Sequence, residues 1–207
     1  IQSTGGTIIV NQGIYLTPNI QIRQSGTLKG LHPSIQSGIS TSTTSQEVEV
    51  HQTCILDSDT SIPTGKTLVL TSGSVLTMNG KKITSSGTID IENNVNINPD
   101  VRLRYSTTVK GLYPNIQDAL DDQTSSQHVK LTADDYTENI SMRDDSYLMG
   151  EGATQTDLFG SVTFSNVDYA ILSDLEVSQD IIIQNGDYNC LEYVTANNVI
   201  DIDYGVN

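Results

Sequence analysis

Short apolar bursts alternate with turn residues along most of the chain. In residues 62–104 the bursts, such as Leu68-Val69-Leu70 and Ile89-Asp90-Ile91, are separated by Gly or Asn. Residues 162–202 follow the same pattern. Runs of three to five apolar or β-branched residues bounded by Gly, Asn and Pro predict short strands rather than helices. The pattern therefore predicts an all-β protein with many turns.

The spacing of these strands distinguishes between β architectures. It leaves no room for helical crossovers, and clear Asn-Gly turns do not stand between every pair of strands, as a hairpin meander would need. Parallel coils of roughly 20–25 residues, each with two or three short strands stacked ~4.8 Å apart, fit the spacing. We therefore expect a right-handed parallel β-helix with one or two short capping helices. A β-sandwich is the alternative, because many short strands with turn signals fit that fold too.

One phrase occurs twice in the chain. Residues 27–36 (TLKGLHPSIQ) return as residues 108–117 (TVKGLYPNIQ), 81 positions later. Repetition at a long period indicates an array of modules. The repeat predicts three segments: the end of a preceding β-helical module in residues 1–26, a module in 27–107, and a further module, expected to be truncated, in 108–207.

In each copy of the phrase, a proline precedes a residue that can cap a helix. Proline presets φ, and Ser34 or Asn115 follows it. In the second copy three apolar residues of 116–120 lie on one helical face. The first copy continues as Ser37-Gly38-Ile39-Ser40, which is a poor helix former. The phrase predicts a helical turn or two in the second copy and less helix in the first.

The second copy and the residues after it resemble the opening of the pectin-lyase-like right-handed parallel β-helix superfamily. Residues 113–119 (YPNIQDA) match the "YP-x-IQ-x-A" helix that caps the open end of the coil in that superfamily, and Tyr136 and Glu138 match its "G-x-Y-x-E" turn. Residues 148–156 (LMGEGATQT) are similar to a step found in pectin methylesterases. The resemblance covers residues 108 to about 165 well, 27–50 in part, and 13–20 as another strand and turn.

The departures from that superfamily bear on function. Asp134 stands where the turn motif has Gly, and the esterase motifs that supply a catalytic Asp pair, Gln and Arg have no match. Residues 105–207 hold a single arginine, Arg143, and nothing in the sequence places it beside the calcium-binding Asp cluster of a pectate lyase. We therefore favour a non-catalytic structural or adhesive segment of a β-helical repeat protein. The alternative is the N-terminal portion of a polysaccharide-active enzyme similar to pectin lyases or esterases.

The net charge of −15, from 25 acidic and 10 basic residues, narrows the range of partners. It argues against nucleic acid and against an anionic membrane surface, both of which attract basic residues. No apolar run approaches the ~20 residues of a membrane span. An acidic surface rich in Ser, Thr and Asn is typical of secreted proteins, so we expect an extracellular or cell-surface location. Candidate partners are a polysaccharide or cell-surface glycan, and a second β-helix end through self-association.

Calcium is the one cofactor for which the sequence offers candidates. Asp57 and Asp59 are two residues apart, as are Asp201 and Asp203, so each pair shares one face of an extended strand. Asp187 lies in a turn with neighbouring Asn side chains. Carboxylate and amide oxygens are the ligands that calcium prefers. The alternative is an ordinary turn or solvent-exposed role, because no twelve-residue calcium loop is present.

Tyrosines and cysteines are the remaining residues that the sequence offers for a functional role. Tyr113, Tyr136 and Tyr147 are candidates for stacking on sugar rings, with packing at turns as the alternative. Cys54 and Cys190 lie among strand-like residues, which predicts buried thiols rather than a disulfide. The three histidines are scattered and lack metal-ligand spacing, so the sequence predicts no catalytic residues and no confident metal site.

Overall fold

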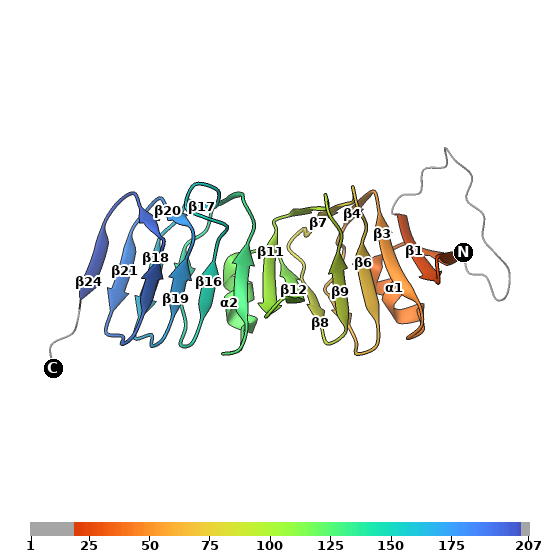
Figure 1. Cartoon of the computed structure of the whole chain (residues 1–207), viewed down its shortest axis with the longest axis horizontal. Helices are drawn as coiled ribbons and strands as arrows, with labels where there is room; N and C mark the ends of the chain where they lie inside the picture. The colour runs from red at the N-terminus through yellow and green to blue at the C-terminus, as the bar shows by residue number, and fades with distance from the viewer. Residues whose placement is uncertain (1–18, 204–207) are drawn as a thin grey trace. The chain divides into compact units, whose positions relative to one another are not determined.

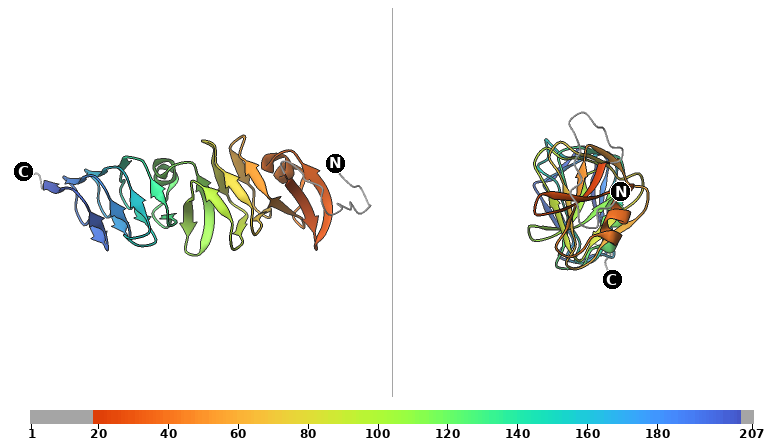
Figure 2. Two further views of the ribbon diagram at one scale, coloured as in Figure 1. Left: turned by 90° about the horizontal axis from the view of Figure 1, so that it is seen from above. Right: turned by 90° about the vertical axis from the view of Figure 1, so that its right-hand side faces the viewer.

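The computed structural model describes residues 19–203, so the strands predicted before residue 19 lie outside the described residues. The described residues divide into two compact units: residues 19–100 with 108–114, and residues 101–107 with 115–203. Within each unit, short parallel strands stack coil upon coil (Figures 1 and 2). This confirms the expected β-solenoid over the β-sandwich. The module boundaries placed after residues 26 and 107 stay a prediction.

Among its described residues, the first unit contains one helix and three groups of hydrogen-bonded strands. Within the unit, neighbouring strands follow the orders β2-β1-β3-β6-β9, β10-β7-β4 and β12-β8-β5. The elements are β1 (Asn19–Gln24), β2 (Thr27–His32), α1 (Ile35–Thr41), β3 (Glu47–His51), β4 (Thr53–Ile55), β5 (Thr60–Ile62), β6 (Thr67–Leu70), β7 (Val75–Thr77), β8 (Ile83–Ser85), β9 (Thr88–Ile91), β10 (Asn96–Asn98) and β12 (Thr108–Tyr113).

The second unit repeats this plan with its own helix. Its sheets have the orders β22-β19-β16-β13-β11, β14-β17-β20-β23 and β15-β18-β21-β24. The elements are β11 (Val101–Tyr105), α2 (Ile116–Asp122), β13 (His128–Leu131), β14 (Asp135–Tyr136), β15 (Ile140–Ser141), β16 (Tyr147–Met149), β17 (Asp157–Leu158), β18 (Val162–Ser165), β19 (Ile171–Ser173), β20 (Glu176–Val177), β21 (Ile181–Gln184), β22 (Cys190–Glu192), β23 (Thr195–Ala196) and β24 (Ile200–Asp203).

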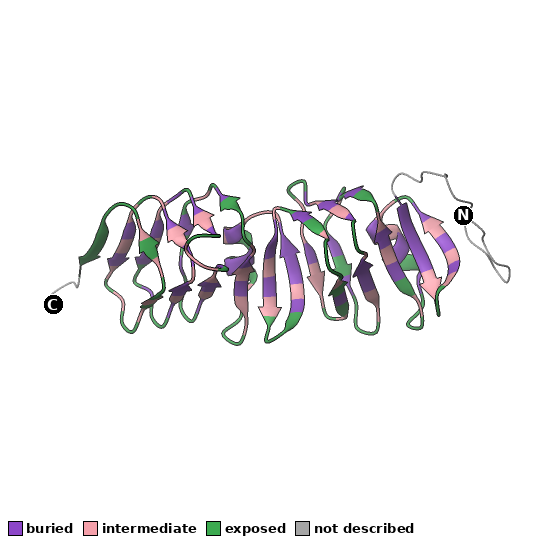
Figure 3. Ribbon diagram, turned by 45° about the horizontal axis from the view of Figure 1, so that its top comes forward, coloured by how far each residue is buried: buried purple, intermediate pink, exposed green. Residues whose placement is uncertain are grey.

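Apolar residues stack on their counterparts from one coil to the next. In the first unit Val48 pairs with Leu68, which pairs with Ile89. In the second unit Leu148 pairs with Leu172, which pairs with Leu191. Within many of the strands, buried positions alternate with less buried ones (Figure 3). The alternation places one apolar column inside the coil and leaves the opposite face of each strand to solvent.

The repeated arrangement extends upstream of the repeated phrase. In the first unit β3 returns antiparallel to β1, with Val50 opposite Ile20. In the second unit β13 returns antiparallel to β11, with Leu131 opposite Val101. The paired positions in the two units differ by the same 81 residues as the phrase. Within the strand before the phrase, only Arg23 and Arg104 are identical at this offset, so residue identity did not mark the strand as part of the repeat.

The two helices have the same length, which corrects the expectation of less helix in the first copy. Each spans seven residues, and each is capped: the Ser34 side chain accepts a hydrogen bond from the backbone N–H of Ser37, as Asn115 does from Asp118. Gly38 faces the core, where a Cβ would lie 2.8 Å from Cγ1 of Val48. A residue that weakens the isolated helix thus lets it pack closely, and tertiary packing overrides local propensity.

The two cysteines have different environments. Cys54 is buried in the apolar column that includes Leu76 and Ile97, as predicted. Cys190 is exposed, so the prediction of a buried thiol is wrong there. Leu191 continues the inner column at that coil, and strand alternation turns its neighbour Cys190 outward. Both thiols are free.

Truncation of one inner residue tests the importance of these columns. Leu76 is fully buried, so Leu76→Ala is expected to lower the free energy of unfolding by about 2–5 kcal/mol. Ile55 lies on the neighbouring strand with 61% of its surface exposed, and Ile55→Ala should cost less than about 0.5 kcal/mol. Urea unfolding followed by circular dichroism measures both. Equal losses in the two variants would contradict the assignment of the inner column.

Candidate functional site

Three aspartates form a column at one turn of the second unit. The turns that precede β16, β19 and β22 stack on each other and carry Asp144, Asp168 and Asp187. The carboxylate of Asp144 accepts a hydrogen bond from the backbone N–H of Asp168 at 2.8 Å. The carboxylate of Asp168 accepts one from the backbone N–H of Asp187 at 2.7 Å. The side chains of Asp144 and Asp168 therefore each hold the next coil, and all three aspartates remain exposed to solvent.

A second column stands beside the first, one residue later in each turn. It consists of Asp145, Tyr169 and Tyr188, which have φ of 56°, 58° and 60°. The backbone N–H of Asp145 donates to the carbonyl of Asp168, and that of Tyr169 donates to the carbonyl of Asp187. A positive φ is a costly conformation for a residue as bulky as tyrosine. The fold therefore holds two large rings in a strained backbone at the surface.

The two rings of this column stack on each other. The ring centroids of Tyr169 and Tyr188 are 5.0 Å apart, and their planes differ by 6°. The residues nevertheless remain 57% and 74% exposed. We refer to the six residues of the two columns as the tyrosine–aspartate strip: Asp144, Asp145, Asp168, Tyr169, Asp187 and Tyr188.

Sequence reasoning missed the tyrosine–aspartate strip, although the sequence contains a signal for it. The dipeptide Asp-Tyr occurs at residues 168–169 and again at 187–188, 19 residues apart. The same interval separates the register partners Leu172 and Leu191. A search for polar and aromatic residues that recur at the coil period would have placed both rings in one column.

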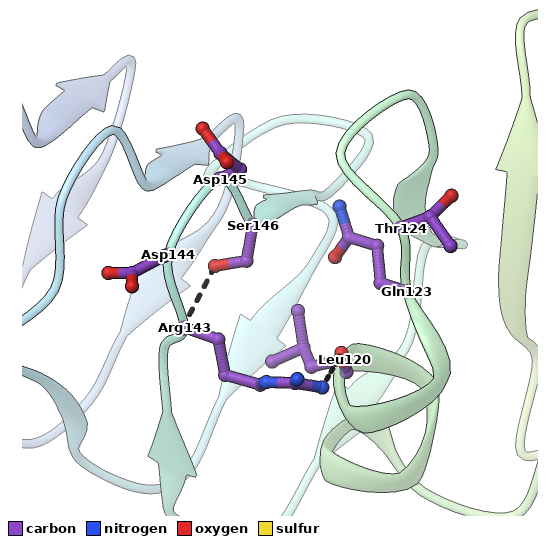
Figure 4. Close-up of a pocket in the computed structure, with 7 residues that line it drawn as sticks. All are labelled: Leu120, Gln123, Thr124, Arg143, Asp144, Asp145 and Ser146. Carbon is purple, nitrogen blue, oxygen red and sulfur yellow. Dashed lines mark hydrogen bonds between the residues drawn. The ribbon is translucent and has the colours of Figure 1, made fainter.

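A small hollow lies next to the first turn of the strip (Figure 4). It has a volume of about 30 Å³, and its lining residues are Leu120, Gln123, Thr124, Arg143, Asp144, Asp145 and Ser146. Sites for small molecules usually have several hundred Å³. The hollow therefore has room for water rather than for a sugar unit.

Arg143 occupies the side of this hollow that faces α2. Its guanidinium donates hydrogen bonds to the backbone carbonyls of Leu120 and Asp121, at 3.1 and 2.5 Å. The last turn of α2 has no basic residue of its own, so Arg143 supplies the positive charge that a helix C-terminus favours. Asp144 and Asp145 point away from the guanidinium in Figure 4. The arrangement gives Arg143 a structural role at the helix end.

Glu138 holds the other end of α2. Its two carboxylate oxygens accept hydrogen bonds from the backbone N–H groups of Ile116 and Gln117, at 2.8 and 2.9 Å. These N–H groups belong to the first turn of the helix, where no partner within the helix is available. Tyr136, the other residue of the same motif, is buried. The motif that resembles the β-helix superfamily thus fastens the helix to the coil.

The calcium candidates do not come together in the described structure. Asp57 accepts a hydrogen bond from the hydroxyl of Ser58, and Asp59 accepts one from the backbone N–H of Lys82. Asp187 belongs to the tyrosine–aspartate strip. Asp201 and Asp203 lie on β24, opposite Ile182 and Gln184. Among residues 19–203, no group of three His, Cys, Asp or Glu side chains is arranged to hold a metal ion.

The glycan candidates need correction for two of the three tyrosines. Tyr113 and Tyr136 are only 1% and 6% exposed, so their rings are not available for stacking on a sugar. Both side chains face inward, a direction that composition does not reveal. Tyr147 is partly exposed, and its ring lies 5.9 Å from that of His128.

Burial changes the titration of three groups. It lowers the pKa of His32, whose Nδ1 lies 3.2 Å from the hydroxyl of Ser37. It also lowers the pKa of His128, with further contributions from the positive charges of Arg104 and Lys130. The pKa of the buried Cys54 thiol is raised to about 11, so this thiol stays protonated and unreactive at neutral pH.

Comparisons with known proteins found no relative: no family model, curated protein or solved structure matches the chain. Within the described part of the chain, neither helix has the length and apolar character needed to cross a membrane.

Removal of the Glu138 carboxylate tests its role at α2. Glu138→Ala is expected to lower the free energy of unfolding by about 1–3 kcal/mol, because two N–H groups lose a charged acceptor. Asp57 occupies the corresponding position of the first copy and is exposed, so Asp57→Ala is the matched control and should have little effect. Thermal unfolding of both variants measures the two losses of stability. A loss in the control as large as that in Glu138→Ala would contradict the assigned role.

The lowered pKa of His128 predicts a pH dependence of stability. The unfolded chain takes up a proton near pH 6.5, whereas the folded chain takes it up at lower pH. The stabilising contribution is therefore complete above about pH 6.5 and is lost as the pH falls through the folded pKa. In urea titrations between about pH 7.5 and 5, His128→Gln should reduce the fall in unfolding free energy. Identical pH profiles for parent and variant would exclude this contribution.

Proposed function

We propose that this chain is a non-catalytic structural or adhesive segment of an extracellular or cell-surface β-helical repeat protein. The proposal includes a relationship to the pectin-lyase-like superfamily, which the helix-capping motif supports. One observation carries the proposal. The polar side chains that could have formed an active site instead form hydrogen bonds that hold one coil to the next.

The acidic side chains illustrate this use. Asp144 and Asp168 each accept a hydrogen bond from a backbone N–H one coil further on. In the first unit Asp59 accepts one from Lys82 on the following coil, and Glu92 accepts one from Ser72 on the preceding coil. A carboxylate in such a bond lies on the outside of the coil and contacts the turn of an adjacent coil. General acid–base chemistry needs two carboxylates that converge on one substrate.

The motif shared with polysaccharide-active proteins supports the same reading. Tyr136 is buried, Glu138 caps α2, and Arg143 bonds the carbonyls at the other end of that helix. All three residues therefore have structural partners within the second unit. A scaffold needs such contacts, because each coil is stabilised only by its neighbours. Self-association through coil ends, and attachment to a glycan, remain further proposals for what the scaffold does.

Incubation with polysaccharides tests the proposal against the enzyme alternative. The 207-residue chain is mixed with pectin, alginate and related uronates, with and without calcium. We expect no unsaturated product, no methanol and no new reducing ends, because Asp144 and Asp168 bond the next coil and Arg143 bonds the end of α2. Release of any of these products by the purified chain would overturn the proposal in favour of a polysaccharide-active enzyme.

A further inference from the structure

We propose that the tyrosine–aspartate strip binds arginine side chains of a basic partner polypeptide. The inference deepens the adhesive function proposed above and rests on it, since it names the class of partner that the scaffold holds.

The first observation is the exposure of two strained rings. Tyr169 and Tyr188 have positive φ, stack at 5.0 Å, and keep 57% and 74% of their surface in solvent. Asn or Gly would occupy such turns at a lower conformational cost. Packing does not require the rings either, because more than half of the surface of each residue is exposed. A ring kept at the surface under these conditions is suited to a ligand.

The second observation is the charge beside the rings. Asp144, Asp168 and Asp187 stand in the adjacent column, and Asp145 occupies the position before Tyr169 in the ring column itself. Asp144 and Asp168 each use one oxygen, Oδ1, for the backbone of the next coil. The one basic side chain in these three turns, Arg143, is directed to the carbonyls at the end of α2. The strip therefore presents hydrogen-bond acceptors and negative charge next to aromatic surface.

Guanidinium is the biological group that uses both features at once. Its planar, delocalised cation stacks on aromatic faces, and its N–H groups donate in pairs to carboxylates. An ammonium group pairs with the carboxylates but lacks the planar surface. A neutral sugar would gain from the rings but has no need of four carboxylates, and an acidic polysaccharide would be repelled by them. Charge complementarity with a chain of net charge −15 adds to the preference for a cation.

Calorimetric titration of the full 207-residue chain with a short oligo-arginine peptide tests the proposal. The same peptide with citrulline in place of arginine is the uncharged control, and oligo-lysine tests the need for a planar cation. We expect binding of oligo-arginine, weaker binding of oligo-lysine and none of the citrulline peptide. Raising the salt from about 0.05 M to about 0.5 M should weaken binding strongly, because exposed charges are screened.

Variants assign the binding to the strip. Tyr169→Asn with Tyr188→Asn removes both rings and places a residue that tolerates positive φ at each turn, so the fold is retained. We expect roughly tenfold weaker binding of oligo-arginine. The control is Tyr193→Asn, because Tyr193 is 77% exposed and also has positive φ, at 52°, but lies outside the strip. Circular dichroism verifies that all variants are folded.

A charge variant completes the test. Asp168→Asn removes one charge and keeps an oxygen that can accept from the N–H of Asp187, so it should weaken binding without unfolding the turn. Asp180→Asn is the matched control, since Asp180 accepts from the N–H of Val199 on a neighbouring turn.

Equal affinity for the parent and both sets of variants would overturn the proposal, as would binding of the citrulline peptide. Binding of a neutral oligosaccharide that is lost with the two rings, without binding of oligo-arginine, would assign the strip to a glycan instead. Each of these results leaves the scaffold proposal standing, because only catalytic release from polysaccharides overturns that one.

Discussion

The register between successive coils is the constraint on which each unit depends. A parallel strand pairs with the strand one coil earlier, as Leu68 does with Val48 and Leu172 with Leu148. Because strand side chains alternate, a shift of one residue would expose every inner residue of that strand. The register therefore fixes the apolar column inside and, at the same time, the polar columns outside. The tyrosine–aspartate strip exists because three turns stack with the same register as the core.

The same constraint explains how a chain with 25 acidic residues maintains closely stacked coils. Stacking places like residues beside one another, so columns of carboxylates repel each other. In the second unit the repulsion is offset where a carboxylate accepts a backbone N–H from the next coil, as Asp144 and Asp168 do. Hydrogen bonds to charged acceptors contribute more than neutral ones. Each of these carboxylates uses only Oδ1 in this bond, which leaves its other oxygen available to a partner.

Much of the fold could be predicted from sequence, because the positions of Ile, Val and Leu follow the coil period and the strand alternation. The helix α1 was underestimated, since Gly38 looks unfavourable until its close contact with Val48 is known. The antiparallel strands β1 and β11 were not joined to the repeat, because they share only one identical residue, Arg23 and Arg104, besides their alternation. For the candidate site, strand patterns alone did not tell which tyrosines face inward: Tyr113 and Tyr136 are buried, whereas Tyr169 and Tyr188 are exposed. The stacked turns follow from the coil register, and the sequence signal for it at this site is the Asp-Tyr dipeptide that recurs after 19 residues.

Hydrogen exchange at the turn amides tests most directly the claim that carboxylates hold successive coils together. The backbone N–H groups of Asp168 and Asp187 lie in exposed turns but donate to the carboxylates of Asp144 and Asp168. The account predicts that both amides exchange much more slowly than those of an unstructured peptide. It further predicts that Asp144→Ala accelerates exchange at Asp168 while the neighbouring strand β18 stays protected. Exchange at the rate of an unstructured peptide in the parent protein would contradict the account.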